Sequence, residues 1–190
     1  MNAKGRRYLL LLLISIAIRT FFYFFRFEGT FFEGIANAHI LYDVIFYSVM
    51  ISLLETLKER KWLVGLAWGT LTAMIAFNLI EWARPRYLTL TQSLARFMIV
   101  ISLVFLIFNV SLFFIRKSPA RIFFRLLSVV MSLDYIYGAY VGLFYPVNPD
   151  NWLMSRAGYY VIAILDNLLL LLAVLRTPEL RKPPYADFLE

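Results

Sequence analysis

Six long apolar runs dominate this chain, and short polar segments separate them. The runs cover about residues 8–27, 35–57, 62–82, 97–115, 126–145 and 157–175. A helix of about 20 apolar residues crosses the roughly 30 Å of hydrocarbon in a bilayer. The pattern therefore predicts an all-α membrane protein with six transmembrane helices. No segment between the runs is long enough for a folded unit, so we expect one polytopic membrane domain over 1–190 and no soluble domain.

The composition agrees with this prediction. The chain is 62% hydrophobic and 16% charged, whereas soluble domains are about 45–50% apolar and about 25% charged. Its net charge of +7 comes from basic residues clustered between the apolar runs, which is typical of membrane topology signals. We therefore expect the lipid bilayer, and no nucleic acid, as a partner. With no Cys and a single His, we expect no metal and no cofactor.

The start of the chain resembles a secretory signal peptide. A basic head over residues 1–7 precedes a leucine run, and Ala36-Asn37-Ala38 has the small residues of a cleavage site. The apolar run, however, continues through Phe27, well beyond the length of a signal-peptide core. We therefore expect residues 8–27 to remain as the first membrane span.

The distribution of Lys and Arg predicts the orientation. With the N-terminus inside, the inner segments hold twelve basic residues and the outer segments hold five. The inner ones are Lys4, Arg6, Arg7, Lys58, Arg60, Lys61, Arg116, Lys117, Arg121, Arg176, Arg181 and Lys182, and the outer ones are Arg26, Arg84, Arg86, Arg96 and Arg156. Because cytoplasmic loops carry the excess of basic residues, both termini are predicted to be cytoplasmic. A bacterial inner membrane is the expected location.

Four charged residues lie deep inside the apolar runs, at least two helical turns from either end: Arg19, Asp43, Asp134 and Asp166. A charge at the centre of a membrane helix costs about 2.5–3.5 kcal/mol. Such residues usually face the interior of a bundle, where they are paired, protonated or hydrated. Arg19 is able to neutralise only one of the three carboxylates, so a proton or a cation is expected to share the site.

Other polar residues fall near the same depth. His39, Asp43 and Tyr47 recur every four residues, which places them on one helical face. Asn78 lies in the third run and Tyr137 in the fifth. Seven tyrosines are candidates for supplying hydroxyl groups to the site: Tyr42, Tyr47, Tyr135, Tyr137, Tyr140, Tyr159 and Tyr160. The predicted network, which opens towards the outer side, comprises Arg19, His39, Asp43, Asn78, Asp134, Tyr137 and Asp166. We interpret it as a site that binds or moves a proton, a small cation or a cationic solute.

Two alternatives remain open. The chain is an accessory subunit of a larger membrane complex if the network only fixes helix packing. Gly65 and Gly69 have the spacing of a helix-association motif, which suits contact with other membrane subunits or self-association. The weaker alternative is a lipid-modifying enzyme with His39 and Asp43 as acid and base. No nucleophile or metal motif accompanies them, so we expect a protein that is not an enzyme.

Overall fold

The described part of the chain is entirely helical. The computed structural model describes residues 1–24, 39–83, 92–115, 119–144 and 152–181. They form α1 (Ala3–Phe24), α3 (His39–Thr56), α4 (Lys61–Ala83), α5 (Gln92–Ser111), α6 (Arg121–Phe144) and α7 (Trp152–Arg176), with 3-10 turns η1 (Leu112–Phe114) and η2 (Pro178–Leu180). Over these residues the structure confirms the predicted all-α class and the six helices. In the portions of the helices whose side chains are described, no stretch is both long and apolar enough to cross a membrane.

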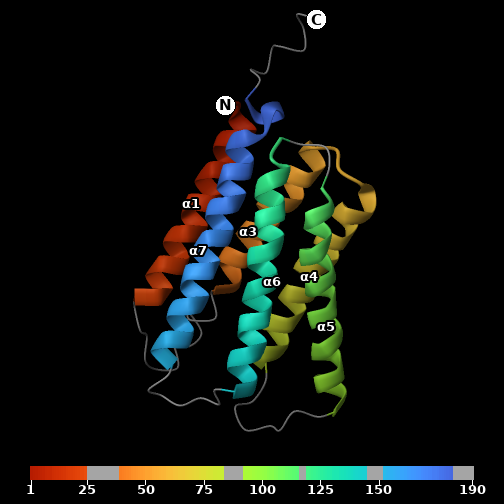
Figure 1. Cartoon of the computed structure of the whole chain (residues 1–190), viewed down its shortest axis with the longest axis vertical. Coiled ribbons are helices and arrows are strands. Elements are labelled where there is room, and N and C mark those ends of the chain that lie inside the picture. Colours follow the sequence, from red (N-terminus) through yellow and green to blue (C-terminus); the bar gives the residue numbers. More distant parts are fainter. Residues whose placement is uncertain (25–38, 84–91, 116–118, 145–151, 182–190) are drawn as a thin grey trace, which may run out of the picture.

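The six helices form a closed ring. Each packs against the next in the order α1, α3, α4, α5, α6, α7, and α7 returns to α1. Helix α3 also contacts α7. Figure 1 shows the helices side by side along the long axis of the molecule. Among the described helices, α1 therefore packs against α3, which follows it in sequence, and against α7 near the other end of the chain.

The core lies around α3. Its residues Met50, Leu53 and Leu54 are fully buried, as are Phe108 of α5 and Phe124 of α6. The ring of Tyr47 on α3 packs against Phe108, with 6.0 Å between the ring centroids. Side chains from α3 thus fill the space towards α5 and hold the two sides of the ring together.

Two polar residues join α5 to α6 inside this core. The Ser128 hydroxyl donates to the Asn109 carbonyl at 2.6 Å. The Asn109 side-chain amide donates to the Met131 carbonyl at 3.4 Å. Both side chains are buried, so these bonds fix the register of α5 against α6 where water does not compete.

The start of α1 and the end of α7 are tied together. The Asn2 amide donates to the Leu180 carbonyl at 2.8 Å, and the Asn2 side chain donates to the Glu179 carbonyl at 3.1 Å. Gly5 packs so closely here that an added Cβ would lie 3.2 Å from Leu180 Cβ. The two ends of the described chain therefore lie at the same end of the bundle.

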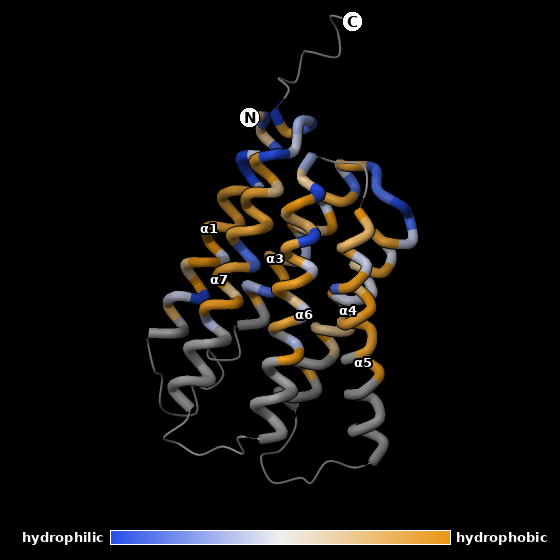
Figure 2. Tube along the Cα trace, in the orientation of Figure 1, coloured by the Kyte–Doolittle hydropathy of each residue, from blue (hydrophilic) through white to orange (hydrophobic). Residues whose placement is uncertain are grey.

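Basic side chains collect at this end of the bundle, which is the hydrophilic end in Figure 2. They come from the start of α1, the α3–α4 turn, the start of α6 and the end of α7. The exposed ones are Lys4, Arg6, Arg7, Lys58, Arg60, Lys61, Arg121, Arg125, Arg176 and Arg181. We call this surface the basic end.

Helix α3 ends in a left-handed turn at Lys58, whose φ is 50°. The Glu59 amide donates to the Leu54 carbonyl at 3.1 Å, and the Lys58 amide donates to the Glu55 carbonyl at 3.0 Å. These two bonds define a Schellman cap, in which glycine is the usual residue at the left-handed position. Lys58 therefore carries a conformational strain that glycine would not.

We expect Lys58→Gly to raise the free energy of unfolding by about 0.5–1 kcal/mol, because it removes the Cβ from the left-handed position. Lys58→Ala is the matched control: it removes the same charge but keeps the Cβ, and it should stay within about 0.5 kcal/mol of the parent. Denaturant unfolding followed by circular dichroism measures both. Equal stability of the two variants would show that the left-handed turn carries no strain.

Candidate functional site

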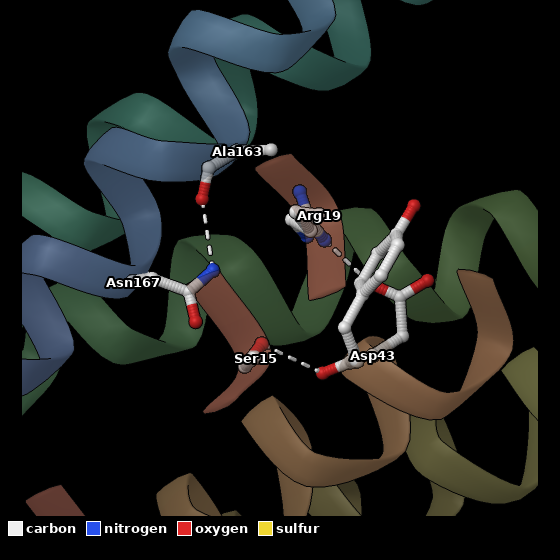
Figure 3. A network of polar contacts seen from close by, with 6 residues as sticks. Ser15, Arg19, Asp43, Ala163 and Asn167 are labelled. Atoms are coloured by element: carbon white, nitrogen blue, oxygen red, sulfur yellow. Dashed lines mark hydrogen bonds and ion pairs between the residues drawn. The ribbon is translucent and has the colours of Figure 1, made fainter. Parts of the chain in front are cut away.

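An ion pair joins α1 to α3 part-way along the bundle. Arg19 Nη2 lies 2.6 Å from Asp43 Oδ1, and the two side chains are 17% and 22% exposed. Figure 3 shows Arg19 reaching across from α1 to Asp43 on α3. The structure therefore places together two of the residues that the sequence singled out, and it joins them directly.

The ring of Tyr42 supports the same guanidinium. Arg19 Cζ lies 3.9 Å from the centroid of the ring, a distance typical of a cation–π contact. Arg19 is therefore held between a carboxylate and an aromatic face that come from adjacent residues of α3. Arg19 Nε is buried and has no hydrogen-bond partner among the described residues.

Ser15 adds a second link between the same helices. It lies one turn before Arg19 on the same face of α1, and it is fully buried. Its hydroxyl donates to the Tyr42 carbonyl at 3.2 Å. Tyr42 thus contributes its ring face and its backbone carbonyl to contacts with α1.

Helix α7 also packs against α1. Thr20 Oγ1 and the Tyr160 hydroxyl lie 3.1 Å apart. This contact and the Asn2–Leu180 bond fix the antiparallel register of α1 and α7, so Asp166 and Asn167 lie at the level of about Ser15. Figure 3 shows Asn167 of α7 together with Ser15 and Arg19 of α1.

Both of these α7 residues are buried. Asp166 is 9% exposed and Asn167 is fully buried. The Asn167 side-chain amide donates to the Ala163 carbonyl of its own helix at 2.9 Å. Its carbonyl oxygen Oδ1 is buried and accepts no hydrogen bond among the described residues. A buried acceptor of α7 therefore lies at about the same level of the bundle as Ser15.

The remaining candidates are placed only by their helices. His39 begins α3, Asn78 is on α4, and Asp134 and Tyr137 are on α6. The side chains of these four residues lie outside the described part of the structure, so their membership of the network stays a prediction. Within the described residues, no three His, Cys, Asp or Glu side chains form a group that would hold a metal ion.

Sequence reasoning missed Ser15, Thr20 and Asn167. Each is adjacent to a charged residue, or one helical turn from it. Ser15 and Thr20 flank Arg19, and Asn167 follows Asp166. A search for polar residues next to each deep charge in sequence, or one helical turn from it, would have found them.

We use the name α1–α3–α7 cluster for six residues that lie at about the same level of these three helices: Ser15, Arg19, Tyr42, Asp43, Asp166 and Asn167. Its described charges are one guanidinium and two carboxylates. Comparison of the chain with protein-family models, with curated proteins and with solved structures gives no match.

Proposed function

We propose that this chain is an integral membrane protein of a cytoplasmic (inner) membrane, with both termini on the cytoplasmic side. We also propose that its α1–α3–α7 cluster binds or moves a proton, a small cation or a cationic solute. The two parts of the proposal rest on different observations, one on the outer surface of the bundle and one on the charges of the cluster.

The outer surface supports the membrane part. Large apolar side chains point outwards along several helices, each between 38% and 60% exposed. On α6 they are Ile122, Leu126, Val129, Leu133 and Ile136; on α5 Val100, Leu103, Ile107 and Val110; and on α7 Val161, Leu165, Leu168 and Leu172. Soluble monomers rarely expose contiguous apolar patches of more than a few hundred Å². Hydrocarbon is the environment that such faces suit.

The basic end supports the orientation. Ten of the exposed basic side chains gather there, whereas the exposed acidic residues described at that end are Glu55 and Glu179. Anionic headgroups of the cytoplasmic leaflet attract such a surface. The helices of 18 to 25 residues would reach about 27–38 Å from this surface towards the other side of the bilayer.

The acidic residues of the cluster support the transport part. Arg19 and Asp43 form an ion pair at 2.6 Å, and Asp166 adds a second carboxylate that is 9% exposed. A buried negative charge in a low-dielectric bundle favours uptake of a proton or a cation. The buried Asn167 Oδ1 and the Ser15 oxygen are further ligands that a cation prefers.

Flux through reconstituted protein tests this function. In proteoliposomes with an imposed gradient, Asp166→Asn is expected to reduce flux to the level of empty vesicles, because it replaces the buried carboxylate with a group that cannot take up a proton or balance a cation. A trapped pH-sensitive dye reports protons, and an ion-sensitive dye reports Na⁺ or K⁺. Glu179→Gln, which removes an exposed carboxylate from η2, is the matched control and should keep parental flux. Parental flux in a correctly folded Asp166→Asn protein would exclude this function.

A second candidate is an accessory subunit of a membrane complex, in which the cluster serves packing. It is favoured by the contacts of Arg19 with described residues, which join α1 to Asp43 and Tyr42 of α3. In that case Asp166→Asn would lower the yield of folded protein, and the parent would copurify with other membrane subunits. The lipid-modifying enzyme built on His39 and Asp43 stays a prediction, because the His39 side chain lies outside the described residues.

A further inference from the structure

At one corner of the basic end, Arg125 lies near the start of α6, where it makes a cation–π contact with η1 at the end of α5. Arg125 Cζ lies 5.3 Å from the centroid of the Phe113 ring in η1. Phe113 in turn packs edge-on against Phe114, with 6.0 Å between their centroids. Although Arg125 is exposed, the cation–π contact limits the directions that its guanidinium takes. One donor group is therefore already oriented at the basic end.

Arg121 lies one helical turn before Arg125 on α6, so both guanidiniums project from the same face. Both side chains are exposed. The nearest acidic residue of α6 in sequence is Asp134, about 13 Å further along the helix axis. α5 and η1 contain no acidic residue. The corner is thus a local concentration of positive charge.

Helices α5 and α6 pack against each other. Further along both helices from this corner, each has an exposed apolar face. On α6 the face runs from Leu126 to Ile136, which are 45% and 60% exposed. It extends about 15 Å along the helix axis, which is the hydrocarbon depth of one leaflet. Figure 2 shows the change from hydrophilic to hydrophobic colour down α6 from its start.

This order of groups matches one kind of molecule. A phospholipid has a phosphate directly above its acyl chains, and planar guanidinium groups bind phosphate oxygens through paired hydrogen bonds. Two guanidiniums above an apolar face fit a lipid with net negative charge better than a zwitterionic one, in which a cationic headgroup would meet them.

We infer that Arg121 and Arg125 bind the phosphate of an anionic phospholipid whose acyl chains lie along the exposed faces of α5 and α6. This inference rests on the membrane part of the proposed function and is independent of the transport part. The site is fixed by Phe113, which positions Arg125, and by the helical repeat, which positions Arg121.

Native mass spectrometry of the full chain in neutral detergent tests the site. Phosphatidylglycerol and phosphatidylcholine with the same acyl chains are added in turn. The parent is expected to retain phosphatidylglycerol with about tenfold preference. Arg121→Gln with Arg125→Gln should abolish the preference. Lys58→Gln with Lys61→Gln is the matched control, because it removes two charges from another corner of the basic end, and it should keep the preference.

Equal loss in both double variants would overturn the inference, because the basic end would then act only through its total charge. Preference retained without Arg121 and Arg125 would also overturn it. Phe113→Leu, which removes the ring but keeps all charges, should weaken the preference and covers the case in which the arginine variant does not fold. Failure of the parent to remain in membranes after alkaline extraction would instead refute the membrane part of the proposed function.

Discussion

Asp43→Ala is expected to lower the free energy of unfolding by about 3 kcal/mol, the lower end of the range for breaking a buried ion pair, because this pair is only partly buried. The variant leaves the Arg19 guanidinium, whose side chain is only 17% exposed, without its carboxylate. The Tyr42 ring remains beneath it and compensates in part. Unfolding of the purified protein in mixed micelles, with increasing denaturing detergent and helix content followed by circular dichroism, measures the loss.

A double variant separates the ion pair from the packing around it. Arg19→Met with Asp43→Leu removes both charges and keeps most of the volume, so it should recover most of the stability that Asp43→Ala loses. Glu55→Ala, at an exposed carboxylate of the same helix, is the control and should change stability by less than about 0.5 kcal/mol. If Asp43→Ala cost no more than Glu55→Ala, the pair would have no structural role.

Phe108→Ala is expected to lower the free energy of unfolding by about 3–5 kcal/mol, which is typical of a large aromatic residue deleted from a core. Phe108 is fully buried on α5, and its ring lies 6.0 Å from that of Tyr47 on α3. Its removal opens a cavity between the two sides of the ring of helices. The same detergent titration measures the effect.

Val110 provides a matched position on the same helix. It is two residues beyond Phe108 and 46% exposed on the outer face. Val110→Ala should cost less than about 0.5 kcal/mol, because no packed neighbour loses its contacts. Similar losses of unfolding free energy at both positions would contradict the structure, in which Phe108 faces the core and Val110 faces outwards.

The helices were predictable from the sequence because each coincides with an apolar run, but their ends were not. Helix α6 begins at Arg121, whereas the predicted run begins at 126. Helix α7 begins at Trp152, whereas the predicted run begins at 157. Hydropathy excludes arginine and serine from a run, yet the backbone accepts them in the first turns of a helix at little cost. An apolar run therefore measures a buried or lipid-facing length and not the length of the helix.

The cluster was predictable only in its charged members. Arg19, Asp43 and Asp166 attract notice because an ionised group at depth is costly. Thr20 attracts no notice in the sequence, because a threonine hydroxyl inside a helix is able to bond to a carbonyl of its own helix. Thr20 makes such a bond to the Ile16 carbonyl at 2.8 Å. Its contact with Tyr160 depends on the register of α1 against α7, which is set by tertiary packing. Thr20 and Tyr160 are 140 residues apart in sequence, so no local sequence pattern predicts that they are in contact.

The closed ring of helices also orders events during synthesis. Helix α1 leaves the ribosome first and α7 last, so the contact between them completes the ring only at the end of translation. Both members of the Arg19–Asp43 ion pair are synthesised before α7, so this pair needs no residue from the end of the chain. The contacts of α1 with α7, in contrast, require the whole described chain.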